Sequence, residues 1–190
     1  MPARAPVPAA LACACLLAAC GAEKTELPDP NAAPTGAVQE LRFPKAGLSL
    51  ELRRPLQVTR RQAPEVFRFS LPSGALISAL AYSRTEPVPK TRAQLRDARR
   101  RLLAATRHRD PSFTLEAARL VTVAGVRGVE VTGTQSLSGG RLDTRSVHLY
   151  KGSAEYVFEL IAARKDFAHA DRSVLSPMLR TVRLTGRVGA

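Results

Sequence analysis

The sequence predicts an α+β domain in which an antiparallel sheet of about six to eight strands lies between two main helices. Three observations lead to this class. Apolar and polar residues alternate with period two in several short segments. Four such segments, within 113–162, are separated only by short turns. Two segments with helical spacing of apolar residues, 91–107 and 166–179, precede and follow these four strands.

The first strands are predicted before the first helix. Leu48, Leu50 and Leu52 alternate with polar residues, which is typical of a half-buried strand. A second strand is predicted over 66–71, and a third over 75–84 after a Pro-Ser-Gly turn. The third segment is apolar on both faces, which favours a central strand covered on both sides.

The helix over 91–107 begins with a recognisable signal. Thr91 and Gln94 have the spacing of a capping box, in which each side chain bonds the backbone N–H of the other. Its apolar face is predicted to hold Leu95, Ala98, Leu102 and Thr106. Asp110 and Pro111 follow its expected end.

The four strands of the meander are expected at 114–123, 126–135, 141–150 and 154–162. The first is expected to have Leu115, Ala117, Val121 and Val123 on one face. The inward residues of the next two are expected to be Val129, Val131, Val147 and Leu149. In the fourth, alternation predicts that Tyr156, Phe158 and Leu160 lie opposite Glu155 and Glu159.

The second helix is predicted over 166–179, with Asp166 as its cap. Pro177 is expected either to kink the last turns or to begin a separate short helix. A short final strand is expected over 182–184. The apolar stripe of this helix is predicted to consist of Phe167, Ala170, Val174 and Met178.

From residue 41 to 184 the chain resembles the PsbP family, which comprises extrinsic photosystem proteins and their bacterial relatives. The resemblance is carried by Phe43-Pro44, Gly47-Leu48-Ser49-Leu50, Gly125-Val126-Arg127-Gly128-Val129, the strand 154–160 and Leu179-Arg180-Thr181-Val182. Leu56 stands where the family often has a tryptophan, and the chain has none. The resemblance implies a PsbP-like antiparallel sheet between helices and no shared catalytic residue. Many bacterial relatives are lipoproteins.

The first 37 residues are predicted to target and tether the domain. Residues 1–19 have one basic residue and a short apolar run, too short for the roughly 20 apolar residues of a membrane span. Leu17-Ala18-Ala19-Cys20 resembles the lipobox of bacterial lipoproteins. We therefore expect cleavage before Cys20, lipid on Cys20, and attachment to the extracytoplasmic face of a membrane. Gly21 favours the outer membrane in a cell that has one. A non-lipidated signal peptide or an incorrectly assigned start are the alternatives.

The rest of the chain is expected to form one domain. Residues 20–37 are Pro-rich and lack aromatic residues, which predicts a disordered spacer. Residues 38–184 are predicted to be the domain and 185–190 a frayed tail. Cys13 and Cys15 lie in the segment that is removed, so the mature chain is expected to lack a disulfide and a thiol nucleophile.

Residues that could perform chemistry are few. His148 is interpreted as a surface or hydrogen-bonded residue, and His108 as a cation at a helix end. Asp166, His169 and Asp171 are interpreted as a helix start rather than a metal site. We therefore predict no catalytic residue, metal or cofactor, and a non-catalytic accessory or binding module. A small-ligand carrier or an enzyme is the alternative, and a deep pocket with convergent polar groups near His148 would favour it.

The predicted domain is strongly basic. Of 29 Lys and Arg residues, two precede Val38, and of 16 Asp and Glu residues, three do, which leaves 27 against 13 and a net charge of +14. Arg96, Arg100 and Arg107, with Arg99 or Arg101, are expected to share one helix side that contacts anionic lipids or wall polymers. A solvated helix in an arginine-rich composition, typical of a GC-rich genome, is the alternative. Nucleic acid is not an expected partner because no aromatic residues interleave these arginines. No protein partner is indicated.

Overall fold

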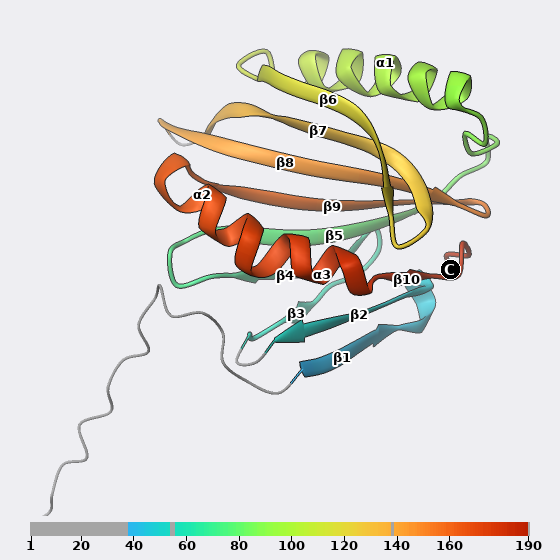
Figure 1. Cartoon of the computed structure of the whole chain (residues 1–190), viewed down its shortest axis with the longest axis horizontal. Helices are drawn as coiled ribbons and strands as arrows, with labels where there is room; N and C mark the ends of the chain where they lie inside the picture. The colour runs from blue at the N-terminus through green and yellow to red at the C-terminus, as the bar shows by residue number, and fades with distance from the viewer. Residues whose placement is uncertain (1–37, 54–55, 138, 190) are drawn as a thin grey trace, which may run out of the picture.

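The computed structural model describes residues 38–53, 56–137 and 139–189, and within them it confirms the predicted α+β class (Figure 1). Seven antiparallel strands form one sheet in the order β3-β4-β5-β9-β8-β7-β6, and three form a second sheet in the order β1-β2-β10. The strands are β1 (Val38–Phe43), β2 (Leu48–Arg53), β3 (Thr59–Arg60), β4 (Glu65–Ser70), β5 (Leu76–Ser83), β6 (Thr114–Val123), β7 (Val126–Leu137), β8 (Gly140–Lys151), β9 (Ala154–Ala163) and β10 (Arg183–Leu184). The helical segments are η1 (Pro44–Ala46), α1 (Arg92–Arg109), α2 (Arg164–Ala170), η2 (Asp171–Leu175) and α3 (Ser176–Thr181).

Two of these strands were missing from the sequence prediction. The first is β1, which pairs with β2 from Val38↔Arg53 to Phe43↔Leu48. Its inward pattern rests on only Leu41 and Phe43 before Pro44 interrupts it. The second is β3, which is two residues long and therefore too short to show alternation. The predicted meander is confirmed as β6 to β9, with each strand paired to the next.

The predicted single face of β6 is wrong at one position. The pairing with β7 shifts between Leu115 and Ala117, so that Glu116 is the extra residue of a β-bulge. This shift turns Leu115 to the same side as Ala118 and Leu120, in the smaller core beneath α1. Val121 and Val123 pack against the larger core on the other side of the sheet. A bulge reverses the alternation, and the sequence pattern by itself does not mark it.

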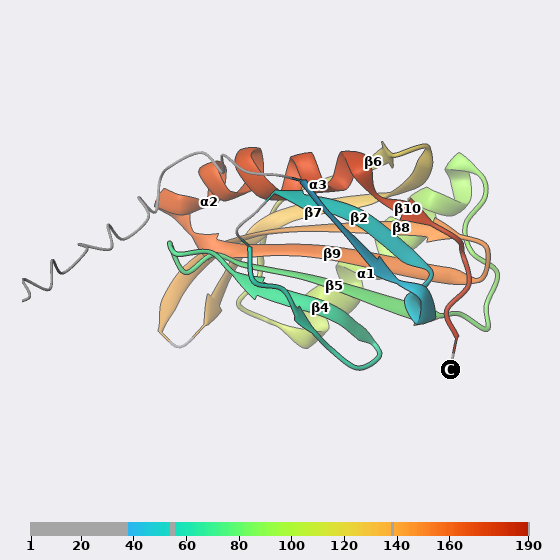
Figure 2. The same cartoon turned by 90° about the horizontal axis from the view of Figure 1, so that it is seen from below.

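Helix α1 covers one side of the seven-stranded sheet, and α2 to α3 lie on the other (Figures 1 and 2). The capping box of α1 is confirmed: Thr91 Oγ1 accepts from the Gln94 N–H at 3.1 Å, and Gln94 Oε1 accepts from the Thr91 N–H at 3.0 Å. Leu95 and Ala98 are buried against the sheet. Leu95 packs with Val129 and Val131.

The second predicted helix is divided into α2, the π-helical η2 and α3. It begins at Arg164, so Asp166 lies inside the first turn and does not cap it as we predicted. A carboxylate in that turn still interacts favourably with the helix dipole. Pro177 lies in the first turn of α3, directly after the π-helical turn, and the helical run from Arg164 to Thr181 continues through it, so it does not begin a separate helix. The predicted apolar stripe is confirmed, with Val174 and Met178 buried.

The larger core lies between the two sheets and the α2 to α3 segment. The even-numbered side chains of β9, Tyr156, Phe158 and Leu160, are fully buried in it. Phe67 of β4 stacks between Phe43 and Phe69, with ring centroids 5.3 Å and 6.0 Å apart. Burying side chains of this size contributes about 1.5–3 kcal/mol each, so this core carries most of the stability of the fold.

One buried ion pair network joins the sheet to the π-helical turn. Glu130 of β7 is only 3% exposed, and Arg145 of β8 donates to it at 2.7 Å. The same guanidinium donates to Asp171 and, at 2.8 Å, to Ser176 Oγ. Arg119 of β6 adds a second contact to Glu130 at 2.6 Å. Because a buried carboxylate is costly without partners, this network holds η2 at one position over the sheet.

The expectation of a frayed tail is wrong for residues 185–189. Thr185 donates its N–H to the Gly47 carbonyl oxygen at 2.9 Å, and Gly189 donates to that of Lys45 at 2.8 Å. The Gly186 carbonyl oxygen accepts from the Ser153 N–H at 3.0 Å, and its N–H donates to Tyr156 Oη at 3.2 Å. The sequence did not predict these hydrogen bonds, because they are made mainly by backbone atoms, which every residue has.

We expect Gly152→Ala to destabilise the protein more than Gly74→Ala. Both glycines lie in turns of the seven-stranded sheet at positive φ, +60° and +83°, so alanine is strained in each by about 1–2 kcal/mol. A Cβ at Gly152 would in addition overlap the Gly186 carbonyl oxygen, whereas a Cβ at Gly74 meets nothing within 4 Å. Urea unfolding of the two variants measures the difference. Equal losses would show that the C-terminal segment is not held against the turn.

Candidate functional site

A hollow of about 430 Å³ lies between α1 and the exposed side of β5, β8 and β9. It exists because α1 packs against β6 and β7 at one edge of the sheet (Figure 1). The side chains of β5 and β9 on that face are therefore left without a covering helix. We call this space the α1 hollow; its lining includes Leu80, Tyr82, Arg84, Glu86, Leu102, Ala105, Thr106, Arg109, His148, Glu155, Val157 and Glu159.

Two smaller hollows adjoin it. One of about 310 Å³ shares Arg84, Glu86, Leu102, Ala105 and Glu155 with the α1 hollow and adds Arg101 and Tyr150. The other, of about 80 Å³, shares Thr106, Arg109, His148 and Glu159 and adds Ser146 and Phe113. The shared residues make the three spaces neighbouring parts of one recess under the helix. Its size is in the range of small-molecule sites.

The strand register places the polar groups of the recess in rows. Glu155 is paired with Tyr82 on β5 and with Tyr150 on β8, so the three side chains cross one face of the sheet. In the next row, Val157 is paired with Leu80 and His148. Neighbouring residues on paired strands have Cβ atoms about 4.5–5.5 Å apart. The recess therefore has one row of three polar side chains beside a second row in which Leu80 and Val157 are apolar and His148 is polar.

His148 and Glu155 form a buried pair at the centre of the recess. The Nδ1 atom of His148 lies 2.9 Å from Glu155 Oε1. The other carboxylate oxygen accepts from Arg84, whose guanidinium also donates to Glu86 at 3.3 Å. This confirms that His148 is hydrogen-bonded, and its burial shows that it is not a surface residue. Because Nδ1 is occupied, Nε2 is the ring nitrogen that remains to meet a ligand.

The environment shifts the ionisation of three groups in the recess. Burial acts to raise the pKa of Glu155, but the hydrogen bonds from His148 and Arg84 outweigh it and the net pKa is lowered. Burial raises the pKa of Tyr150, and the charge of Glu155 adds to this effect. Burial also raises the pKa of Tyr82, with further contributions from Glu159 and Glu155. At neutral pH the recess thus holds an ionised carboxylate between two neutral phenols.

Asp166, His169 and Asp171, the metal candidate considered from the sequence, are not arranged as a metal site. Asp171 pairs with Arg145, and His169 is exposed in the last turn of α2. Within the described ranges no group of three His, Cys, Asp or Glu side chains is arranged to hold a metal ion. His108 is exposed in the last turn of α1, at the helix end where the sequence placed it.

The predicted basic side chains of α1 are at the surface. Arg96, Arg100 and Arg107 are exposed, and Arg100 pairs with Asp97 at 2.8 Å. Arg99 donates to the Ala118 carbonyl oxygen at 3.3 Å and is directed towards β6, so Arg101 is the exposed neighbour. Exposed basic residues also occur on other elements: Arg42, Lys45, Arg60, Arg127, Arg141, Arg172 and Arg183. Cys20 lies outside the described residues.

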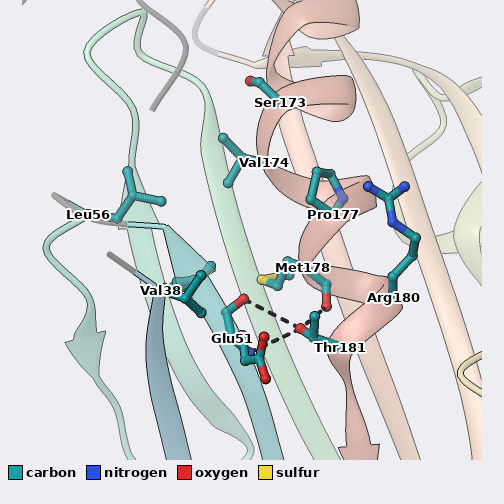
Figure 3. A pocket seen from close by; sticks show the side chains of 10 residues that line it. Val38, Glu51, Leu56, Ser173, Val174, Pro177, Met178, Arg180 and Thr181 are labelled. Atoms are coloured by element: carbon teal, nitrogen blue, oxygen red, sulfur yellow. Dashed lines mark hydrogen bonds between the residues drawn. The ribbon is translucent and has the colours of Figure 1, made fainter. Parts of the chain in front are cut away.

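A second, smaller cleft of about 210 Å³ separates β2 from α3 (Figure 3). One of its polar side chains, Thr181, joins the two elements. Thr181 Oγ1 accepts from the Glu51 N–H at 3.0 Å and donates to the Met178 carbonyl oxygen at 2.8 Å. Val38 and Leu56 on its rim adjoin residues outside the described ranges. Because the α1 hollow is about twice as large and holds the linked His148, Glu155 and Arg84 side chains, we regard it as the candidate site.

The sequence did not place the residues of the α1 hollow together. His148 was singled out, but Glu155, Arg84 and the two tyrosines were not connected with it. The one available signal was the alternation of β9, which puts Glu155 and Glu159 on one face. Their meeting with Tyr82 and Arg84 depends on β5 pairing with β9 across the intervening α1 and meander, which a local pattern does not reveal.

Comparison with known proteins identifies the fold. The cyanobacterial PsbP protein CyanoP from Synechocystis sp. PCC 6803 superposes with a TM-score of 0.59 at 10% identity, over 79% of this chain and 94% of CyanoP. A protein from Bacteroides thetaiotaomicron has a TM-score of 0.51 at 11% identity, over 77% of this chain and 48% of its own. LpqN of Mycobacterium tuberculosis, which is involved in cell envelope biogenesis, has a TM-score of 0.49 at 15% identity, over 78% and 91%.

These similarities establish that the domain has a PsbP-like fold, as the sequence motifs indicated. At 10–11% identity they define the fold and not the task. No family model matches the sequence. No curated protein matches it either. In the part of the chain that the structure describes, no helix has the length and hydropathy of a membrane span.

We expect the contribution of Glu155 to stability to decrease in acid. Its pKa is lowered in the folded state, so its stabilisation is present above the unfolded value of about 4.3 and is lost as pH falls through the folded value. Wild type should therefore exceed Glu155→Gln in unfolding free energy by about 1 kcal/mol or more at neutral pH, and by less near about pH 3. Urea titrations at the two pH values measure this.

The control is Glu116→Gln, which removes the same charge from an exposed side chain on β6. Its difference from wild type should be small at neutral pH. A Glu155→Gln difference that stays constant between the two pH values would contradict the proposed ion pairing.

Proposed function

We propose that the chain is a lipid-anchored, extracytoplasmic, non-catalytic binding module of a bacterial cell envelope, and that its PsbP-like domain holds a small ligand in the α1 hollow. The observation that carries the ligand proposal is the hollow itself, with the His148–Glu155–Arg84 chain fixed along its wall. A preorganised set of polar groups beside apolar surface is the usual composition of a ligand site.

The arrangement of the central polar groups supports a binding role for the hollow. The central groups hold one another, since Glu155 occupies Nδ1 of His148 and is itself held by Arg84. Such a chain fixes the direction of the free Nε2 atom of His148, which suits it to hydrogen-bond a ligand. The tether is supported by the lipobox-like residues 17–20 and by the Pro-rich segment that follows.

The lipid anchor is tested by metabolic labelling with a radioactive fatty acid in the native host. We expect label on the wild-type protein and none on Cys20→Ser, because that cysteine is the proposed acylation site. The matched control is Cys15→Ser, which alters a cysteine within the segment predicted to be removed and should leave labelling intact. Label retained by Cys20→Ser would remove the anchor from the proposal.

The ligand site is tested by native mass spectrometry of the protein purified from its host. We expect a bound small molecule with wild type and its loss from Ala105→Trp, because Ala105 lines both larger hollows and an indole there fills them. Ala104→Trp is the control, since Ala104 is exposed on α1 but does not line the hollows. Equal occupancy in the two variants would contradict binding under α1.

A second candidate function is attraction to an anionic surface. Exposure of Arg96, Arg100 and Arg107 on α1 favours it, at about 1 kcal/mol per basic residue near a membrane. We expect Arg96→Glu with Arg100→Glu to reduce co-sedimentation with anionic vesicles at low salt, and added salt to do the same. The control is Arg127→Glu with Arg141→Glu, an equal charge change on β7 and β8. Equal reductions would show attraction by net charge alone.

A further inference from the structure

Most charged groups of the α1 hollow are balanced within the protein. Arg84 is paired with Glu155 and Glu86, and Glu155 also binds His148. Arg109 and Glu159 are different. Each lines both the α1 hollow and its smaller neighbour, and neither makes an ion pair of 4.0 Å or less with any described residue.

These two charges come from opposite walls of the recess. Arg109 is the last residue of α1, and Glu159 lies on β9 of the sheet below. Tyr82 stands within electrostatic reach of both, since Glu159 acts to raise the pKa of its phenol and Arg109 acts to lower it, after the larger effect of burial. The hollow therefore holds separated charges of opposite sign, with a neutral phenol near both.

Apolar side chains line the same space. Leu80 and Val157 are neighbours on the sheet, and Leu102 faces them from α1. They offer an apolar part of a ligand a surface against which to pack.

The charge of the hollow differs from that of the whole domain. The domain has a net charge of +14, yet Glu86, Glu155 and Glu159 face Arg84 and Arg109 in the hollow. A simple anion would approach unfavourable carboxylates, and a simple cation would approach guanidinium groups. A ligand with both charges can pair with Glu159 and with Arg109 at the same time, so that neither of its charged ends meets only groups of like charge.

We propose that the α1 hollow binds a small zwitterion, with its ammonium group at Glu159 and its carboxylate or phosphate at Arg109. This rests on the proposed function of the hollow as a ligand site and specifies its ligand. A guanidinium pairs with a planar carboxylate or a phosphate through two hydrogen bonds, which suits Arg109 to the anionic end. The shared chemistry belongs both to free amino acids and to a phosphoethanolamine lipid headgroup.

Isothermal titration of the chain from residue 20 onward, carrying Cys20→Ser, tests this at physiological salt. The zwitterions are L-alanine and phosphoethanolamine, and the single-charge halves are ethylamine, propionate, ethanolamine and inorganic phosphate. We expect one zwitterion to bind at least tenfold more tightly than either of its halves. Tighter binding of L-alanine assigns a free amino acid. Tighter binding of phosphoethanolamine, with retention on phosphatidylethanolamine vesicles, assigns the lipid headgroup.

The two charges are tested separately. Glu159→Gln and Arg109→Gln should each weaken the zwitterion at least tenfold while the thermal unfolding of the protein stays close to wild type. Arg96→Gln is the matched control, because it removes the same charge from an exposed α1 residue that does not line the hollow, and it should leave affinity unchanged. Equal weakening by Arg96→Gln would overturn the assignment of the anionic end to Arg109.

Failure of this inference is distinguishable from failure of the proposed function. If a single-charge half binds as tightly as its zwitterion, or if the molecule released from the native protein carries one charge only, the zwitterion is overturned and the hollow remains a ligand site. If the native protein releases no molecule and no probe binds, both are overturned.

Discussion

The alternation of side chains along β9 is the constraint on which both halves of the molecule depend. Its even-numbered residues, Tyr156, Phe158 and Leu160, fill the core between the two sheets. Its odd-numbered residues, Glu155 and Glu159, face the α1 hollow. A shift of pairing by one residue would exchange these sets and bury two carboxylates in an apolar core. The same register that stabilises the fold therefore places the ionisable groups of the candidate site.

The two faces of the seven-stranded sheet treat charge in different ways. On the α2 to α3 face, Glu130 is almost fully buried and is held by Arg145, which also reaches Asp171. These groups satisfy one another and join the sheet to the π-helical turn. On the α1 face, Arg109 and Glu159 line a hollow and make no ion pair with a described residue. In a complete pair each charge offsets the cost of burying the other, whereas charges left apart across a hollow are available to a ligand.

The hollow itself depends on where α1 comes to rest. Its buried residues Leu95 and Ala98 fix it over the β6 and β7 edge, where the smaller core is completed by Leu115 after the β-bulge. Had the helix lain across the centre of the sheet, it would have covered β5 and β9. Incomplete coverage of one sheet face thus produces the site, and the helix that limits it also presents its basic residues outwards.

The sequence by itself determined the local elements. Period-two alternation predicted β2, β4 and β9, an apolar run after a turn predicted β5, and the Thr91–Gln94 pair predicted the start of α1, because each depends on residues close together in the chain. Tertiary structure decided the bulge in β6, the attachment of the C-terminal segment and the grouping of Tyr82, Arg84, His148 and Glu155. These depend on pairing between distant strands and on contacts of backbone atoms. The residues next to a position in the sequence do not show which distant residues it will contact in the fold.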